Sequence, residues 1–153
     1  MIKILFICHG NICRSPMAEF VMKDLVQKAG LSDRFEIASA ATSTEEIGNP
    51  VYPPARQKLA EHGISCVGKT ARQMTRQDYG HYDHLIAMDH NNLRNMVRFV
   101  GSDPEHKVSL LMEHTGRPGD VADPWYTGDF EATWQDVQEG CTALLEELKQ
   151  KLM

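Results

Sequence analysis

Several features that would assign this chain to other protein classes are missing from its 153 residues. The apolar run nearest the N-terminus, Ile4 to Ile7, is far too short for a signal peptide or a membrane span. An excess of positive charge is also missing, because the formal net charge is -5. That balance argues against a general footprint for nucleic acid or for an anionic membrane. We therefore expect a cytoplasmic protein that binds neither nucleic acid nor membrane.

Cysteine is scarce, with only Cys8, Cys13, Cys66 and Cys141 present. These four form no C-x-x-C pair and lack the dense spacing of a secreted disulfide scaffold, so reduced thiols are expected. Zinc binding by Cys8, His9 and Cys13 is disfavoured, since no second ligand pair with finger-like spacing is present. The sequence predicts neither a metal nor a cofactor.

Repeats, low-complexity tracts and linker-like segments are absent as well. The composition, with 42% hydrophobic and 24% charged residues, is typical of a folded globular chain. The length suits one domain with a sizeable core, so we expect a single domain over residues 1–153.

Short apolar runs alternate with helical patterns along the chain. Strands are predicted at Ile2–Cys8, Phe35–Ser39, His84–Met88 and Val108–Leu111. Helices are predicted from Ser15 to the region of Gly30, at Pro54–His62, after a cap at Asp89, and from Phe130 to Leu152. The last helix carries Trp134 and Cys141 in its apolar stripe, and both are interpreted as core. This alternation predicts an α/β fold, a doubly wound four-stranded parallel sheet with helices on both faces.

The loop after the first strand carries the chemistry. It has the pattern C-x5-R-S, formed by Cys8, His9, Gly10, Asn11, Ile12, Cys13, Arg14 and Ser15. Ligands of such sheets bind at the carboxyl ends of the strands. A loop there, followed by a helix that Pro16 helps to start, can point its peptide N–H groups at one anion. Gly10 and Asn11 are residue types that tolerate the left-handed backbone such a loop needs.

These surroundings favour the thiolate of Cys8 and make it a nucleophile without a neighbouring base. Ser15 can donate a hydrogen bond to the sulfur, and Arg14 offers a planar fork that matches two phosphate oxygens. Cys13 has a second interpretation as simple packing, because cysteines in apolar surroundings are often just buried. The loop is predicted to bind and attack a phosphate group.

The segment C-H-G-N-I-C-R-S-P resembles the signature of the low-molecular-weight protein tyrosine phosphatases. Similar segments continue in order, with S-A-A at 39–41, A-R-Q at 71–73, M-D and N-L-R within 88–94, and D-P-W-Y at 123–126. The resemblance covers essentially the whole chain. It implies hydrolysis of protein phosphotyrosine or an aryl phosphate through a cysteinyl-phosphate on Cys8, with phosphate bound by Arg14.

A phenolate leaves slowly without a proton, so the reaction needs a general acid. The resemblance gives this role to Asp123, in a loop rich in Gly and Pro, although a plain Asp-Pro turn also explains the dipeptide. Trp125 and Tyr126 follow the acid and, with Ile12, can line a slot for an aryl ring. Core packing of Trp125 is the alternative.

Further roles follow from the resemblance or from departures from it. Asn11 and Ser39 are implied to support the loop by hydrogen bonds, and a Cys8–Cys13 disulfide is implied on oxidation. His9 is expected at the surface or at the rim, with no catalytic role. Glu45 stands near a position that is often aromatic in relatives, which predicts an acidic rim to the pocket. Lys69 replaces a frequent histidine, so a different supporting network is expected.

Three other functions stay open. A protein-arginine phosphatase of the same fold usually has Thr where this chain has Ile12, which favours phosphotyrosine. An arsenate reductase needs two further cysteines a helix-length apart, and Cys66 and Cys141 do not form that pair. A phosphate-binding pseudophosphatase would lack the nucleophile or the acid, and both Cys8 and Asp123 are present. A monomer or a weak homodimer is expected.

Overall fold

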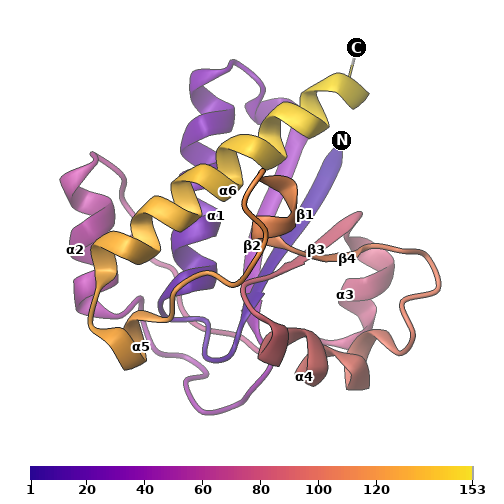
Figure 1. The fold of residues 1–153 in the computed structure, drawn as a ribbon, viewed down its shortest axis with the longest axis horizontal. Helices are drawn as coiled ribbons and strands as arrows, with labels where there is room; N and C mark the ends of the chain where they lie inside the picture. The colour runs from indigo at the N-terminus through magenta and orange to yellow at the C-terminus, as the bar shows by residue number, and fades with distance from the viewer. Residues whose placement is uncertain (153) are drawn as a thin grey trace.

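A computed structural model describes residues 1–152, and its centre is a sheet of four strands in the order β2-β1-β3-β4 (Figure 1). The strands are β1 (Ile2–Cys8), β2 (Phe35–Ala41), β3 (His84–Ala87) and β4 (Val108–Leu110). All three strand pairs are parallel. The predicted four-stranded parallel sheet is therefore confirmed.

The helices cover this sheet and agree with the sequence pattern wherever that pattern was long. They are α1 (Arg14–Lys28), α2 (Pro53–Glu61), α3 (Arg76–His81), α4 (His90–Val100), α5 (Pro124–Thr127) and α6 (Phe130–Lys151), with 3-10 turns η1 (Ser32–Arg34) and η2 (Leu111–His114). In residues 1–152 we find no helix that combines the length and apolar character needed to cross a bilayer.

Three strand ends differ from the prediction. β2 runs on to Ala41, because its parallel register with β1 continues to the Cys8–Ala41 pair. β3 ends at Ala87 instead of Met88, because its register with β1 stops at the Ile7–Ala87 pair. Leu111 leaves β4 and begins η2, where its side chain is fully buried. All three differences arise from pairing and packing with distant segments.

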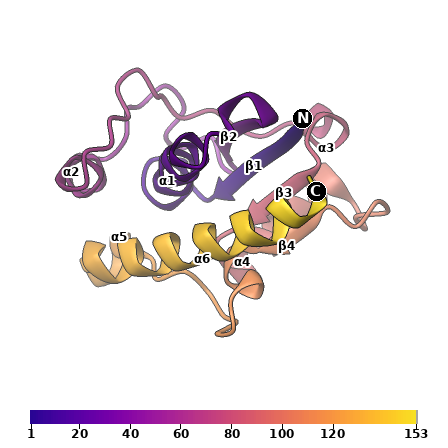
Figure 2. The ribbon, with the colours of Figure 1, turned by 90° about the horizontal axis from the view of Figure 1, so that it is seen from above.

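Side chains of β1 alternate between two cores. Ile4 and Phe6 pack with residues of α1 and α6, whereas Leu5 and Ile7 pack with residues of α3 and α4. A strand buried on both faces explains the continuous apolar run in the sequence. Figure 2 shows α6 running lengthwise past α1, which is seen nearly end-on, and the two helices are in contact. Helices therefore cover both faces, as predicted.

The strand order locates the site. β2 lies beyond β1, and β4 lies beyond β3, so the connections diverge between β1 and β3. In open α/β sheets the crevice at this switch point, beyond the carboxyl ends of the strands, is where ligands bind. The loop after β1 leads into α1 and the loop after β3 leads into α4, at the end of the molecule opposite the two chain termini (Figure 1).

Candidate active site

The buried strand β1 delivers Cys8 to the crevice, and the chain then turns sharply before α1 begins at Arg14. Asn11 makes this turn with φ of 60°, the left-handed conformation expected for it. Gly10 is needed for another reason. Its φ is not positive, but a Cβ at this position would lie 3.3 Å from the Cγ of Glu46. Gly10 therefore allows a close approach of two loops.

Two hydrogen-bond donors converge on the Cys8 sulfur. The hydroxyl of Ser15 lies 3.0 Å from Sγ, and the backbone N–H of Asn11 donates to Sγ at 3.3 Å. The Asn11 amide also donates to the Ser15 oxygen at 2.8 Å, which leaves the Ser15 proton to point at the sulfur. Cys8 is 4% exposed, and both donors stabilise negative charge on its sulfur.

The Asn11 side chain has all of its hydrogen-bonding groups satisfied. Nδ2 donates to Ser15 and, at 2.9 Å, to the hydroxyl of Ser39, while Oδ1 accepts from the backbone N–H of Arg72 at 3.2 Å. Ser39 in turn donates to Glu19 Oε1 at 2.5 Å. A buried chain of polar groups thus supports the loop from β2, α1 and the segment before α3. The implied contact between Asn11 and Ser39 is present.

A buried ion pair anchors the far end of this chain. Lys69 Nζ lies 3.2 Å from Glu19 Oε1 and donates to the backbone oxygen of Ser39 at 3.0 Å. Burial lowers the pKa of Lys69, although Glu19 acts in the opposite direction. The supporting network around Lys69 is therefore formed by Glu19 and Ser39, since the ammonium group reaches both.

Sequence reasoning missed Glu19. Its side chain is only 5% exposed, and it lies on one face of α1 with the buried residues Ser15, Met22 and Val26. That spacing of three and four residues was the available signal, since a charged residue in a buried stripe needs a partner.

Arg14 reaches across the switch point between β1 and β3. Nη1 donates to Asp89 Oδ2 at 2.8 Å and to the backbone oxygen of Val121 at 3.2 Å, and Nη2 donates to Asp123 Oδ2 at 3.3 Å. Burial lowers the pKa of Arg14, but the negative charges of Cys8, Asp123 and Asp89 outweigh it and leave this pKa raised. The guanidinium is therefore a permanent positive charge on the cavity wall.

Asp89 has two functions where one was predicted. Its Oδ1 accepts from Asn92 N at 2.7 Å and caps α4, as expected, while its Oδ2 holds Arg14. The second contact was not predicted. The position of Asp89 just beyond the carboxyl end of a parallel strand was the signal that pointed to the site.

Asp123 immediately precedes α5. Its Oδ1 accepts from the backbone N–H of Trp125 at 3.1 Å, and its Oδ2 accepts from Arg14. Trp125 and Tyr126 are 58% and 85% exposed, so the alternative of core packing for Trp125 is wrong. The indole leans on the ring of Tyr52, with ring centroids 5.1 Å apart, and leaves most of its surface open.

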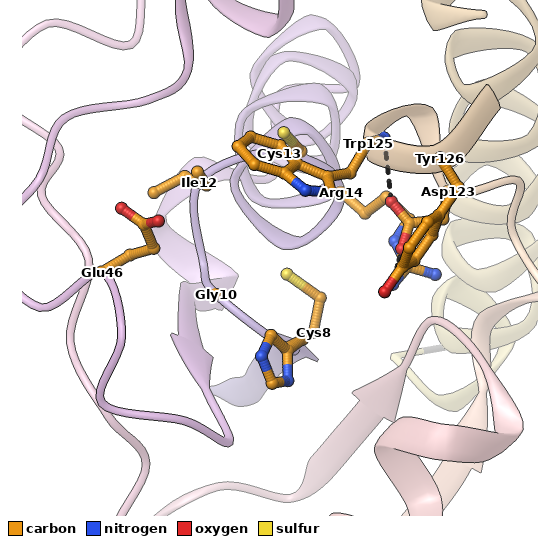
Figure 3. A pocket seen from close by; sticks show the side chains of 10 residues that line it. Cys8, Gly10, Ile12, Cys13, Arg14, Glu46, Asp123, Trp125 and Tyr126 are labelled. Atoms are coloured by element: carbon orange, nitrogen blue, oxygen red, sulfur yellow. Dashed lines mark hydrogen bonds and ion pairs between the residues drawn. The ribbon is translucent and has the colours of Figure 1, made fainter. Parts of the chain in front are cut away.

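Figure 3 shows the cavity with the Cys8 sulfur pointing into it, Ile12 and Glu46 on one side, and Arg14 and Asp123 on the other. The lining residues are Cys8, His9, Gly10, Ile12, Cys13, Arg14, Glu46, Asp123, Trp125 and Tyr126. Asn11 and Ser15 do not line the cavity, and their side chains support the loop by hydrogen bonds.

Glu45 was predicted to line the pocket, and the structure corrects this by one residue. The Glu45 carboxylate turns to Nε2 of His9, 3.0 Å away, and the next residue, Glu46, lines the cavity beside Gly10. His9 is at the rim as expected, with a side chain that is 53% exposed.

Cys13 is buried at the side of the cavity. Burial, followed by the charge on Cys8, raises the pKa of the Cys13 thiol to about 12, so it is protonated at neutral pH. This environment makes Cys13 a poor nucleophile. Among residues 1–152, no three or more His, Cys, Asp and Glu side chains are grouped so that they could hold a metal ion.

A sulfur with converging donors, a buried guanidinium and an adjacent carboxylate suit the binding of a tetrahedral anion and attack on it. The chain matches the family described as low molecular weight phosphotyrosine protein phosphatase over residues 3–153.

Individual relatives agree. The low molecular weight protein-tyrosine-phosphatase YfkJ of Bacillus subtilis is 38% identical, with 99% of this chain and 98% of that protein covered. Its crystal structure superposes with a TM-score of 0.96 at 37% identity, over 100% of this chain and 98% of that chain. The rat low molecular weight phosphotyrosine protein phosphatase is 38% identical over 94% of this chain and 93% of its own. A Drosophila arginine phosphatase has a TM-score of 0.87 at 31% identity, over 97% and 98% of the two chains.

The chain belongs to the low molecular weight phosphotyrosine protein phosphatase family. The protein is therefore a cysteine-dependent phosphatase, and the family assigns it phosphotyrosine proteins as its class of substrate. Both the predicted family and the predicted activity are confirmed.

Proposed function

We propose that Cys8 is the nucleophile of this phosphatase, that Arg14 binds the transferred phosphate, and that Asp123 is the general acid and base. One observation carries the proposal. The Cys8 sulfur accepts hydrogen bonds from Ser15 and Asn11 at the cavity, and the wall of that cavity holds both Arg14 and Asp123.

In the first step the Cys8 sulfur attacks phosphorus, and the bond from phosphorus to the phenolic oxygen breaks. The N–H groups of the loop and the Arg14 guanidinium stabilise charge on the phosphate oxygens. Arg14 Nη2 holds the Asp123 carboxylate, so an entering phosphate competes for this donor and frees the carboxylate. The freed group takes up a proton from water and turns toward the leaving oxygen as a carboxylic acid. Asp123 then transfers its proton to the phenolate.

In the second step water attacks the phosphorus of the cysteinyl-phosphate while Asp123 accepts a proton from it. The sulfur–phosphorus bond breaks, and inorganic phosphate leaves. Sulfur departs as a thiolate, which the donors Ser15 and Asn11 stabilise in the position where they already lie. The same two contacts therefore favour attack and departure.

The cavity walls support an aryl substrate. Ile12 is buried and apolar, and Trp125 and Tyr126 supply aromatic surface at the opening. The likeness to a Drosophila arginine phosphatase keeps phosphoarginine as the second candidate. Cys66 and Cys141 are both buried in the core, which disfavours an arsenate reductase relay. Side-by-side assays with phosphotyrosine peptides, phosphoarginine and arsenate separate the three activities.

Replacement of the nucleophile tests the proposal. Cys8→Ser is expected to abolish turnover, because an alkoxide is not available at neutral pH, while binding of inorganic phosphate persists. Cys66→Ala, a change at another buried cysteine outside the cavity, is the matched control and is expected to keep activity. Activity and phosphate binding are measured on both variants, with mass spectrometry of acid-quenched wild-type enzyme for phosphocysteine. Hydrolysis retained by Cys8→Ser would contradict the assignment.

We also propose that the enzyme acts on phosphotyrosine proteins in the cytoplasm, as a monomer or a weak homodimer. Four free thiols are typical of a reducing compartment. The exposed rings of Trp125 and Tyr126 are the surface through which weak self-association is expected, and sedimentation at increasing concentration measures it.

A further inference from the structure

The segment that carries Asp123 is held by four consecutive backbone groups. It has no regular structure of its own from Val121 to Asp123. Val121 N–H donates at 2.8 Å to the backbone oxygen of Met88, the residue that follows β3, and Val121 oxygen accepts from Arg14 at 3.2 Å. These two bonds tie the segment to the switch point of the sheet.

The next two backbone groups, those of Ala122, are held by α6. Ala122 N–H donates to Asp136 Oδ2 at 3.0 Å, and Ala122 oxygen accepts from the hydroxyl of Thr133 at 2.8 Å. Thr133 and Asp136 are three residues apart and therefore face the same side of the helix. Thr133 is fully buried, so its hydroxyl needs a partner, and it also lies 3.4 Å from Asp129 oxygen. The shorter distance identifies Ala122 as the main acceptor.

Asp136 also holds the beginning of the same loop. Its Oδ1 accepts from Arg117 Nη2 at 2.9 Å, and Arg117 Nη2 donates to Glu139 at 2.8 Å. The loop from Arg117 to Ala122 is thus closed onto α6 at both ends by one carboxylate. This arrangement fixes the peptide just before Asp123.

A fixed backbone beside a movable carboxylate is what a general acid requires. Asp123 Oδ2 has to leave Arg14 and reach the leaving oxygen by side-chain rotation alone, and its side chain is 28% exposed. The end point of that rotation is set by the position of the Asp123 Cα. Displacement by about 1 Å at a catalytic group can cost about 100-fold in rate.

We propose that Thr133 and Asp136 are positioning residues for proton transfer by Asp123, acting through the two hydrogen bonds to Ala122. The inference deepens the proposed function and rests on the role of Asp123 in it. Because the two residues lie on α6 and do not line the cavity, they act on the acid and leave phosphate binding and Cys8 in place.

Dependence on the leaving group separates this role from a merely structural one. For wild type and each variant, kcat/KM is measured on a series of aryl phosphates from dinitrophenyl phosphate to phenyl phosphate. This ratio reports the first chemical step. Dinitrophenolate leaves without a proton, whereas phenolate needs one. The variants are Thr133→Val and Asp136→Ala, which remove a bond to Ala122, and Thr133→Ser and Asp136→Asn, which keep a donor or an acceptor. Gln135→Ala, exposed on the same helix, is the matched control, and Asp123→Asn is the reference for a missing acid.

Thr133→Val and Asp136→Ala are expected to lose about 10-fold in kcat/KM on phenyl phosphate and less than about two-fold on dinitrophenyl phosphate. Thr133→Ser and Asp136→Asn should recover most of the loss. Gln135→Ala should match wild type in kcat/KM on every substrate. Asp123→Asn should show the steepest dependence of kcat/KM on the leaving group. Thermal unfolding of each variant confirms that the protein is folded under the assay conditions.

Two outcomes overturn the proposal in distinguishable ways. In the first outcome, kcat/KM of Asp123→Asn depends steeply on the leaving group, but Thr133→Val and Asp136→Ala lose the same factor in kcat/KM on every aryl phosphate. The acid assignment then stands, and the positioning role is wrong. If Asp123→Asn itself shows no added dependence on the leaving group, Asp123 is not the acid, and the positioning role fails with it.

Discussion

Glu19 and Lys69 place two opposite charges beneath the catalytic loop, with side chains that are 5% and 13% exposed. Removing Lys69 leaves the buried Glu19 carboxylate with the partly exposed Lys23 as its remaining counter-ion, at a cost on the order of 1 to 3 kcal/mol. Lys69→Met is therefore expected to lower the free energy of unfolding by roughly this amount. Activity should fall as well, because Glu19 and Ser39 support Asn11. Urea unfolding and kcat measure the two effects.

Lys23→Met is the matched control at the single-residue scale. Lys23 binds the other oxygen of the same carboxylate, at 2.6 Å, but its side chain is 44% exposed. An ion pair open to solvent contributes less than about 1 kcal/mol, so this variant should unfold close to wild type. Equal losses in the two variants would show that burial does not decide the contribution of the lysine.

At the residue scale, the sequence predicted the members of the site that lie close together in one motif. Cys8, Arg14 and Ser15 belong to one short motif, and the structure brings them together with Asp123 as expected. Asp89 was missed as a partner of Arg14 because the two are separated by 75 residues, and no local pattern links them. The catalytic roles of these residues stay predictions until variants are measured.

At the scale of elements, Gly140 allows α6 to pack closely against η2. A Cβ built on Gly140 would lie 2.5 Å from Leu111 Cγ, and Leu111 is fully buried. Alanine improves helix propensity by about 1 kcal/mol over glycine, whereas overpacking a core costs about 1 to 3 kcal/mol. Gly140→Ala is therefore expected to lower the free energy of unfolding, measured in urea, by up to about 2 kcal/mol.

Gly80 provides the comparison, because it lies in α3 and a Cβ there would have no neighbour within 4 Å. Gly80→Ala should stabilise the protein by about 0.5 to 1 kcal/mol, through helix propensity alone. A stabilising Gly140→Ala would mean that η2 moves away from α6 without cost.

Long helices could be predicted from the sequence, whereas the shortest helices could not. α6, with 22 residues, shows its apolar stripe directly, whereas α3 and α5, with six and four residues, are too short for a periodic pattern. The start of α3 is instead marked by Asp78, whose Oδ2 accepts a hydrogen bond from the backbone N–H of Thr75 at 2.7 Å. The end of β4 could not be predicted, because the change at Leu111 depends on packing against Gly140 of α6.

For the whole molecule, the alternation of strands and helices was sufficient to predict the layers of the fold but not the order of its strands. Every apolar run suits any buried position in a parallel sheet, and the order depends on which helices pack together. α6 contacts α1 although more than 100 residues separate Arg14 from Phe130, and this contact closes one face of the sheet. The switch point, and with it the site, follows from that arrangement.

Stability against pH also belongs to the whole molecule, since it sums over seven histidines. The chain carries a net charge of -5, and uptake of protons as the pH falls reduces the repulsion among its negative charges. This general effect favours the folded state as the pH falls.

His84 opposes this trend. It begins β3, where burial, aided by the positive charge of Lys151, lowers its pKa below the ordinary value of 6.5. Above pH 6.5 the imidazole is neutral in both the folded and the unfolded chain. Below pH 6.5 the unfolded chain takes up the proton more readily, so the free energy of unfolding decreases as the pH decreases. His84→Gln is therefore expected to lose less free energy of unfolding than wild type between about pH 7.5 and about pH 5.5. Urea unfolding at the two values measures the difference, with the exposed His106→Asn as control. If His84→Gln and wild type change in parallel, burial of His84 does not contribute to the acid sensitivity of the fold.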